Sequence, residues 1–308
     1  MVEYNVHIKE MEEKMEHLVK KVAAIHDLSG YGRASLTTII PILSNMKVQV
    51  CPVPTAILST HTGGFEGYSF IDLTDYMQEH INHWKKLNLE FDCIYSGFLG
   101  SARQIEIVAD FIDYFGKKAK FTVVDPVMGD NGKLYKTMGE DMVNGMRNLI
   151  QKADIITPNF TEVMYLLGKD YKEDITEEKV KKYLKELSQM GPKIVIATSV
   201  PDTNSNELDK KTSVVAYDRE NDVFWRVSCK YIPASYPGTG DAYTSVVIGS
   251  LLQGDSLPIA IERGVQFITQ CIMASYGFKY PSKEGVLLEK MLDVLKVPMI
   301  STNYEMLK

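Results

Sequence analysis

The sequence predicts an α/β protein with a mostly parallel central sheet and helices on both of its faces. Short runs rich in β-forming residues alternate along the chain with longer segments of helical periodicity, which is typical of this architecture. With 308 residues, of which 45% are apolar and 24% charged, the chain can also bury a substantial core. Both observations fit one large α/β domain or two smaller ones.

The predicted strands alternate with helices in chain order. Six strands are predicted over 21–28, 47–53, 91–98, 120–127, 153–159 and 193–200. Helical periodicity fills most of the gaps between them, for example in SARQIEIVADFIDYFGKK (101–118) and EEKVKKYLKELSQMG (177–191). After the sixth strand, SVVAYD and DVFWRV predict an antiparallel hairpin, and three helices are predicted to close the chain.

No boundary divides the chain after its first residues. We find no linker rich in Pro, Gly or Ser, no low-complexity run and no internal repeat, so residues 21–308 are expected to form one domain. Residues 1–20 are a charged amphipathic lead-in, in which Met11, Met15, Leu18 and Val19 recur at roughly helical spacing. Packing is the simplest role for this stripe, and partial disorder is the alternative.

Composition excludes several classes of function. The net charge of -6 and the scattered Lys and Arg argue against nucleic acid as a partner. No apolar run is long enough to span a membrane, and the first residues are charged rather than signal-like. The cysteines show neither a disulfide nor a zinc spacing and are expected to be reduced; they are Cys51, Cys93, Cys229 and Cys271. We therefore expect a cytoplasmic protein.

Polar and glycine-rich residues follow the predicted strands, where an open α/β sheet binds its ligands. They occur in HDLSGYGRAS after the first strand, SGF after the third, DPVMGDNGKLY after the fourth and TPNFTE after the fifth. Because the carboxyl ends of parallel strands share one edge, these residues are expected to gather there. The sequence therefore predicts an active-site edge.

Two of these clusters carry carboxylates. Asp125 ends a buried strand and Asp130 lies five residues further on, so the pair could flank a hydrated Mg²⁺ carried by a nucleotide. A capped turn explains the same residues equally well. Asn159 and Glu162 have the spacing of a helix capping box, which alone would account for them, although the same geometry points both side chains toward a metal's water shell.

The stretch PGTGDAY combines a tight turn with a helix start. Asp241 follows Gly238, Thr239 and Gly240 directly, at a place where unpaired backbone N–H groups and the helix dipole attract anions. A dinucleotide fingerprint would need glycine at Tyr243, and no Gly-Lys-Ser/Thr follows for a P-loop. A tight corner with a dipole-stabilising acid would also explain the stretch by itself.

Taken in order, these motifs resemble a known family. The series HDLSGYGRASL, STHTGG, YSGFLGS, DPVMGDNGKLY, ITPNFTEVMYLLG, VIATSV and PGTGDAY is similar to the vitamin B6 kinases of the ribokinase superfamily, over residues 21 to about 276. The resemblance implies a ribokinase-like fold and ATP-dependent phosphorylation of the 5'-hydroxymethyl group of pyridoxal, pyridoxine or pyridoxamine. It further implies Mg²⁺ and a homodimer, and it leaves a requirement for a monovalent cation such as K⁺ open.

The resemblance also implies roles for individual residues near ATP. The family's anion hole falls on Gly238, Thr239 and Gly240, and its catalytic base on Asp241. Its positions near Mg-ATP fall on Asp125, Asn159, Thr198 and Ser199 for the nucleotide and on Asp130 and Glu162 for the metal. Many bacterial relatives carry Lys where this chain has Thr198, so metal ions are expected to neutralise more of the phosphate charge here.

On the vitamer side, the implied contacts include one marked departure from the family. His61 and Thr62 match a pair that lines the pyridine pocket, Ser29 lies near it, and Phe98 replaces a tyrosine found in many members. Asp27 stands where many pyridoxal kinases have serine, and its carboxylate could pair with an amine or the ring nitrogen. Pyridoxamine is therefore the favoured vitamer. The alternatives are a hydroxymethylpyrimidine kinase and a non-catalytic relative that carries pyridoxal phosphate.

Overall fold

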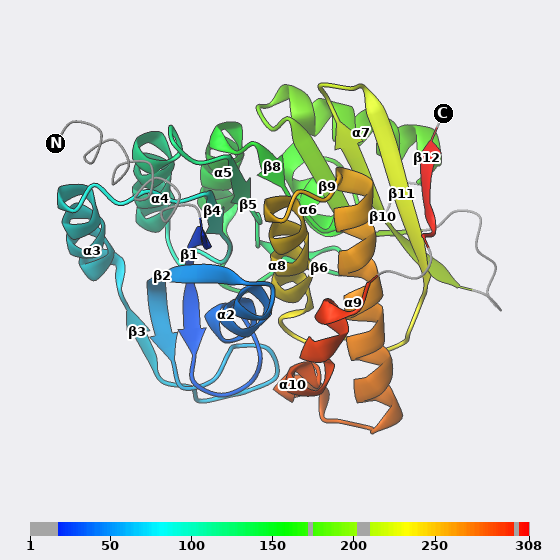
Figure 1. Cartoon of the computed structure of the whole chain (residues 1–308), viewed down its shortest axis with the longest axis horizontal. Helices are drawn as coiled ribbons and strands as arrows, with labels where there is room; N and C mark the ends of the chain where they lie inside the picture. Colours follow the sequence, from blue (N-terminus) through cyan, green and yellow to red (C-terminus); the bar gives the residue numbers. More distant parts are fainter. Residues whose placement is uncertain (1–17, 172–174, 202–209, 299–301, 308) are drawn as a thin grey trace, which may run out of the picture.

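The structure is a computed structural model of the whole chain, and it describes residues 18–171, 175–201, 210–298 and 302–307 (Figure 1). Most of the predicted lead-in, including Met11 and Met15, lies outside the described residues. All four cysteines are free thiols, of which Cys93 and Cys271 are buried and the other two half-buried. Within the described part, no helix combines the length and apolarity that crossing a bilayer requires.

One sheet runs through the molecule. Its strands are β1 (Lys20–Ser29), β2 (Val48–Leu58), β3 (Phe70–Asp72), β4 (Cys93–Ser96), β5 (Phe121–Val124), β8 (Ile155–Ile156), β9 (Ile194–Pro201), β10 (Lys211–Asp218), β11 (Val223–Lys230) and β12 (Tyr304–Leu307). Their spatial order is β12-β11-β10-β9-β8-β5-β4-β1-β2-β3. A separate two-stranded ribbon pairs β6 (Gly129–Asp130) with β7 (Lys133–Leu134).

The centre of the sheet is parallel and its edges are antiparallel. Neighbours from β2 through β1, β4, β5 and β8 to β9 are parallel. At one edge β3 joins antiparallel to β2, and at the other edge β10, β11 and β12 follow in antiparallel register. The parallel strands therefore end at a common edge.

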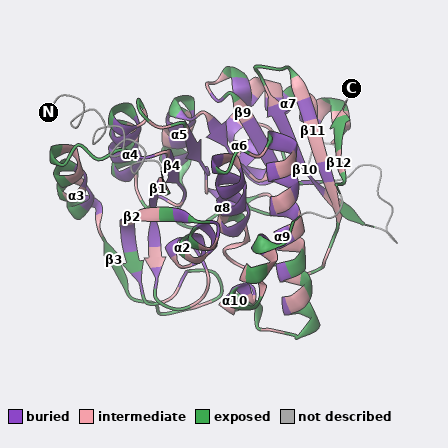
Figure 2. Cartoon of the chain, viewed as in Figure 1, coloured by how far each residue is buried: buried purple, intermediate pink, exposed green. Residues whose placement is uncertain are grey.

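Helices cover both faces of the sheet (Figures 1 and 2). Those on one face are α3 (Thr74–Lys86), α4 (Ala102–Phe115), α5 (Glu140–Leu149), α6 (Phe160–Leu167) and α7 (Glu177–Gln189). Those on the other are α2 (Leu36–Asn45), α8 (Thr239–Leu252) and α9 (Leu257–Gly277). Short 3₁₀ turns at Ile150–Lys152, Ser282–Glu284 and Leu292–Lys296, and α10 (Leu288–Met291), complete the elements.

The core forms because the central strands are apolar on both sides. Along β1, Ala23 and Ile25 face the α3–α7 layer, while Val22 and Ala24 face α2, α8 and α9. Helix starts are set by local caps: Ser101 accepts the Gln104 N–H at α4, and Thr176 accepts the Lys179 N–H at α7. Burial against two helical layers stabilises strands as short as β8.

The predicted α/β class is confirmed, as are the six parallel strands, the β10–β11 hairpin and the three closing helices. Three features were not predicted: β3, the β6–β7 ribbon, and β12, which places a strand after the last helix. Each is only two to four residues long and mostly exposed, so neither alternation nor a buried face marks it in the sequence.

Candidate active site

The start of α8 lies against the loop that precedes α2. Gly238 is the N-cap of α8 and has φ 77°, which a residue with a side chain adopts only under strain. A Cβ at Gly238 would lie 2.2 Å from the Arg33 carbonyl oxygen, so the close approach of the two loops also requires glycine. At Gly240 a Cβ would meet only an Asp125 carboxylate oxygen, at 3.9 Å.

The expected anion hole is thus a helix N-terminus whose first-turn N–H groups have no intrahelical partner. The Ala242 N–H is the first to bond within the helix, to the Gly238 carbonyl at 3.0 Å. The Thr239 hydroxyl donates to the Tyr236 carbonyl at 3.0 Å, which fixes the turn. A phosphate group bound here would meet backbone N–H donors and the positive end of the α8 dipole.

Asp241 stands in the first turn of α8 with its side chain 14% exposed. Its Oδ2 accepts the Ser35 N–H at 2.8 Å, and its Oδ1 lies 3.8 Å from His26 Nδ1. Burial raises the pKa of Asp241 to about 7, and the hydrogen bond from Ser35 opposes that rise. Burial also lowers the pKa of His26 to about 3, so this ring is neutral.

Asp27 lies at the end of β1 and is also buried. Its Oδ1 accepts the Ser35 hydroxyl at 2.5 Å, and its Oδ2 accepts the Ser29 hydroxyl at 3.1 Å. Burial raises the pKa of Asp27, while both hydroxyl donors oppose this because they stabilise the charged form. Two carboxylates, Asp27 and Asp241, therefore share Ser35 as a hydrogen-bonding neighbour.

His61 has a defined tautomer. Its Nδ1 accepts the Gly63 N–H at 3.1 Å, and its Nε2 lies 2.8 Å from the Lys283 carbonyl oxygen. A carbonyl can only accept, so Nε2 carries the proton and the ring is neutral. Burial lowers the pKa of His61, while Asp27 raises it by its charge, which places the two side chains in one neighbourhood.

The second acidic cluster lies between β5 and α6. Glu162 and Asn159 form a complete capping box: Asn159 Oδ1 accepts the Glu162 N–H at 3.0 Å, and Glu162 Oε2 accepts the Asn159 N–H at 2.8 Å. Glu162 Oε1 accepts the Met128 N–H at 3.0 Å and so also holds the DPVMGD loop. Burial raises the pKa of Asp125 well above its usual range, and the charges of Glu162 and Asp241 raise it further. Burial also raises the pKa of Glu162 to about 8, although its backbone hydrogen bonds oppose this rise.

The remaining nucleotide-side residues lie around this cluster. Asp130 is exposed on β6, where its carboxylate accepts the Asn131 backbone and side-chain N–H groups. Thr198 pairs with Asn159 through an isolated parallel bridge beyond β8. Ser199 has φ 55°, beside a register shift between β9 and β10. These three residues therefore lie near the carboxyl ends of β8 and β9, close to the start of α6.

Two of the described residues that were predicted to line the vitamer pocket, Thr62 and Phe98, make no hydrogen bond to the two carboxylates. Thr62 is exposed, with its carbonyl accepting the Gly64 N–H at 3.1 Å. Phe98 is half-buried and packs against the core on the α3–α7 side. Neither contacts Asp27 or Asp241 through a hydrogen bond in the described structure.

Sequence reasoning missed Ser35 and His26 as site residues. Ser35 stands just before an apolar helix and reads as an ordinary N-cap. His26 precedes Asp27 on β1, and its ring lies 4.3 Å from the Tyr95 ring, centroid to centroid. Gly97 leaves room for it, because a Cβ there would lie 2.3 Å from the His26 ring. The only feature of the sequence that could have indicated a role for Ser35 and His26 is that both belong to the HDLSGYGRAS motif.

The donor set suits a metal ion that arrives with its own ligands. Among the described residues no three His, Cys, Asp or Glu side chains are grouped closely enough to hold a metal ion by themselves. Glu162 already accepts two backbone N–H groups, while Asp130 is exposed. Mg²⁺ usually keeps several waters and binds through one or two carboxylates plus phosphates, so these residues fit a hydrated Mg²⁺ on a nucleotide.

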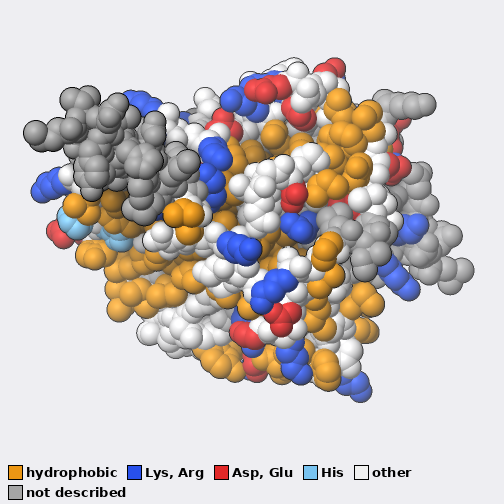
Figure 3. Space-filling view, viewed as in Figure 1, with side chains coloured by type: hydrophobic (Ala, Val, Ile, Leu, Met, Phe, Trp, Pro, Cys, Tyr) orange, Lys and Arg blue, Asp and Glu red, His pale blue; other side chains and the backbone are white. Residues whose placement is uncertain are grey.

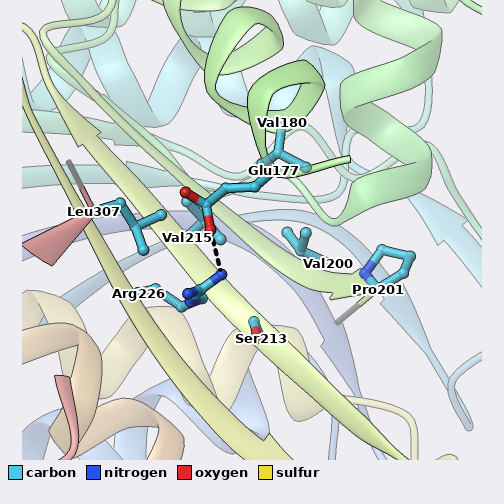
Figure 4. Close-up of a pocket in the computed structure, with 8 residues that line it drawn as sticks. All are labelled: Glu177, Val180, Val200, Pro201, Ser213, Val215, Arg226 and Leu307. Carbon is cyan, nitrogen blue, oxygen red and sulfur yellow. Dashed lines mark hydrogen bonds and ion pairs between the residues drawn. The ribbon is translucent and has the colours of Figure 1, made fainter. Parts of the chain in front are cut away.

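A small cavity lies elsewhere, between α7 and the β9–β11 strands (Figure 4). Its volume is about 20 Å³, which is room for a single water. Glu177 and Arg226 meet across it at 2.9 Å. None of the predicted site residues lines it, and we regard it as a packing defect beside an ion pair.

Comparison with known proteins places this geometry in a family. The phosphomethylpyrimidine kinase family model matches residues 33–286. A candidate phosphomethylpyrimidine kinase of Bacteroides thetaiotaomicron, crystallised in a form with pyridoxal, is 55% identical, with a TM-score of 0.89 over 94% of this chain and 100% of its own.

Two pyridoxal kinases are more distant relatives. The structure of the Lactobacillus plantarum enzyme is 28% identical, with a TM-score of 0.81 over 90% of this chain and 96% of its own. The Dictyostelium discoideum enzyme is 28% identical over 84% of this chain and 87% of its own. These likenesses confirm the expected fold and kinase class, and this chain belongs to the phosphomethylpyrimidine kinase family.

Proposed function

We propose that this kinase transfers the γ-phosphoryl group of ATP to the 5'-hydroxymethyl group of a B6 vitamer. The observation that carries the proposal is the pairing of the buried Asp27, at the end of β1, with the half-buried Asp241, at the start of α8, across Ser35. One carboxylate is placed to accept a proton beside an anion-binding helix terminus, and the other is placed to hold a polar group of the substrate. The resemblance to pyridoxal kinases supports the same assignment.

In the proposed reaction, Asp241 accepts the proton of the substrate hydroxyl as its oxygen bonds to the γ-phosphorus. The bond from that phosphorus to the β–γ bridging oxygen breaks, and ADP leaves with the electron pair. Asp241 then releases the proton to water. The N–H groups of the Gly238–Gly240 turn stabilise the charge on the transferring group, as preorganised donors do in a site that excludes water.

The nucleotide side of the proposal rests on Asp125, Asn159, Thr198 and Ser199, with Asp130 and Glu162 facing the metal's water shell. Bound Mg²⁺ would neutralise phosphate charge during transfer. Asn159 and Glu162 keep their neighbours in place, since the capping box ties the start of α6 to the DPVMGD loop.

On the vitamer side, we propose that Asp27 selects pyridoxamine over pyridoxal and pyridoxine. Each of its oxygens accepts one hydroxyl, and a carboxylate oxygen can accept a second donor. An ammonium group is the donor that such a buried carboxylate favours most. His61 is neutral, so it adds no competing positive charge. Thr62 and Phe98 complete the proposed pocket.

A substrate panel tests the function directly. Pyridoxamine, pyridoxal, pyridoxine and hydroxymethylpyrimidine are each incubated with Mg-ATP, and ADP release and phosphorylated product are measured. We expect the three vitamers to be phosphorylated, with pyridoxamine having the highest kcat/KM. Turnover of hydroxymethylpyrimidine alone would favour the runner-up function, for which the family name is the supporting observation. Pyridoxal binding without ADP release would favour a carrier.

We also propose a cytoplasmic homodimer, as the resemblance implies. The free cysteines fit a reducing compartment. For the dimer, the support is an apolar edge at β2 and β3, where Ile57, Phe70 and Ile71 are 41%, 47% and 58% exposed (Figure 3). Exposed apolar groups that adjoin one another mark interaction surfaces. Sedimentation analysis is expected to give twice the mass of one chain. A mass equal to that of one chain at all protein concentrations would contradict the dimer.

A further inference from the structure

Ser35 has a backbone conformation that residues with side chains rarely adopt. It is the N-cap of α2, with φ 52° and ψ −132°. Steric repulsion from Cβ makes such a conformation unfavourable for a residue other than glycine. The chain nevertheless has serine at this position. An observed outlier of this kind is grounds for asking what the residue does.

The Ser35 side chain does not perform the usual task of an N-cap serine. Such a hydroxyl normally accepts an N–H of the first helical turn, which stabilises the helix. At α2 no such bond forms. The hydroxyl instead donates to Asp27 Oδ1 at 2.5 Å. The Ser35 hydroxyl therefore forms a charge-assisted hydrogen bond to a buried carboxylate in place of a helix cap.

The Ser35 backbone holds the other acid. Its N–H donates to Asp241 Oδ2 at 2.8 Å, and its φ of 52° sets the direction of the side chain relative to that N–H. Ser35 itself is 7% exposed, and its bond to Asp27 is buried while its bond to Asp241 is partly buried. One buried residue therefore bonds to both carboxylates of the site through two different groups.

Neighbouring contacts hold Ser35 in this conformation. It forms an isolated antiparallel bridge with Leu28, which ties it to the end of β1 next to Asp27. The preceding residues are pressed against the start of α8, since a Cβ at Gly238 would lie 2.2 Å from the Arg33 carbonyl and 3.0 Å from the Ala34 Cα. Both helix starts and β1 thus meet at one residue.

We propose that Ser35 is a positioning residue that sets the spacing between Asp27 and Asp241. A vitamer held by Asp27 then presents its hydroxymethyl group to Asp241 in the orientation that the reaction requires. Small errors in such placement lower rates strongly. This inference rests on the proposed function, in which Asp27 contacts the vitamer and Asp241 is the base.

The test compares Ser35→Ala with Ser35→Gly. Both lose the hydroxyl that holds Asp27, but Ser35→Gly also relieves the backbone strain. We expect kcat/KM to fall about tenfold to a hundredfold in both variants, the range for one charge-assisted hydrogen bond. We expect the Tm of Ser35→Gly to equal or exceed that of Ser35→Ala. Activity lost without loss of stability separates positioning from a merely structural role, under which the more stable variant would regain activity.

A matched control comes from the same helix. Thr38 is buried and its hydroxyl has no hydrogen-bond partner in the described structure, so Thr38→Val is expected to leave kcat/KM within about twofold. An equal loss in Thr38→Val would mean that the start of α2 tolerates no change, and this would overturn the proposal.

A double-mutant cycle shows whether Ser35 acts through Asp27. In an Asp27→Asn background the added Ser35→Ala change is expected to lower kcat/KM less than twofold, because the partner carboxylate is already gone. Full additivity would overturn the inference, as would Ser35→Ala and Ser35→Gly variants with unchanged kcat/KM. Failure of the proposed function looks different, because the unaltered protein would then phosphorylate none of the vitamers.

Discussion

Burial and hydrogen bonding act in opposite directions on Asp241. Burial raises its pKa to about 7, while the Ser35 N–H stabilises the charged form. A general base must be deprotonated, so we expect kcat/KM to fall about tenfold per pH unit as the pH drops below about 7. A pH profile of kcat/KM reads the pKa in the free enzyme. A rate independent of pH between 5 and 8 would contradict this assignment.

Removing the base itself should have a larger effect. Asp241→Asn keeps the shape of the side chain but loses the proton acceptor, so we expect kcat to fall roughly 10²- to 10⁴-fold with little change in vitamer affinity. The acid limb of the pH profile should disappear in the same variant. Near-normal kcat in Asp241→Asn would exclude Asp241 as the base.

Asp27 decides the preferred vitamer in our proposal. Pyridoxamine carries an ammonium group where pyridoxal has an aldehyde and pyridoxine an alcohol. A charge-assisted hydrogen bond is worth about 1.5–3 kcal/mol, so a preference of roughly tenfold or more in kcat/KM is expected. Asp27→Ser should abolish this preference selectively. If it instead weakens all three vitamers equally, Asp27 pairs with the ring nitrogen that they share.

Single residues also mark the limit of prediction from sequence. Asp27, Asp125 and Asp241 were predicted as site residues because their motifs occur at strand ends and at a helix start. Ser35 was not predicted, because its sequence context is that of an ordinary cap. Its function depends on a positive φ and on a partner 206 residues away, and neither is visible in local sequence.

At the scale of elements, the start of α6 was predicted more fully. The NFTE motif predicted a capping box, and the structure confirms it. The metal role of Glu162 stays a prediction, since the same carboxylate also accepts the Met128 N–H. Glu162 therefore has two tasks that one mutation removes together: it stabilises a helix start, and it would orient the water shell of the metal.

Glu162→Gln is expected to show both effects. Losing carboxylate acceptors for two backbone N–H groups should lower the free energy of unfolding by about 1–2 kcal/mol. The Mg²⁺ concentration for half-maximal rate should also rise. Thr176→Ala is the control, because it removes the cap of α7 and leaves the capping box of α6 intact. It should lower stability similarly and leave the Mg²⁺ dependence unchanged. Equal Mg²⁺ dependence in both variants would leave Glu162 with a capping role only.

At the scale of the whole molecule, the alternation of strands and helices was enough to predict the fold class and a common edge at which the parallel strands end. The strands that escaped prediction, β3 and β12, are edge strands with mostly exposed residues. β3 is held by pairing with β2, and β12 by pairing with β11 and by the packing of Tyr304 and Leu307 against the core. Such pairing depends on residues that are distant in the sequence, so no local pattern predicts it.

Charge balance across the molecule makes the site depend on cations. The chain has a net charge of -6, and the proposed site gathers Asp125, Glu162 and Asp241 where a triphosphate must also bind. Thr198 lies in the second half of β9, and the resemblance to the B6 kinases implies that many bacterial relatives carry Lys at this position. We therefore expect Mg²⁺ to neutralise phosphate charge in this site that a lysine neutralises in those relatives.

Thr198→Lys should relieve part of this dependence. A positive charge within several ångströms of the phosphates is worth roughly 1–2 kcal/mol at the effective dielectric of a protein surface, or about five- to thirtyfold in binding. The Mg²⁺ concentration for half-maximal rate should fall accordingly. Asn82→Lys on exposed α3 makes the same change in net charge away from β9 and should have no such effect. If both variants lower the Mg²⁺ requirement equally, the cause is overall charge, and Thr198 has no place at the phosphates.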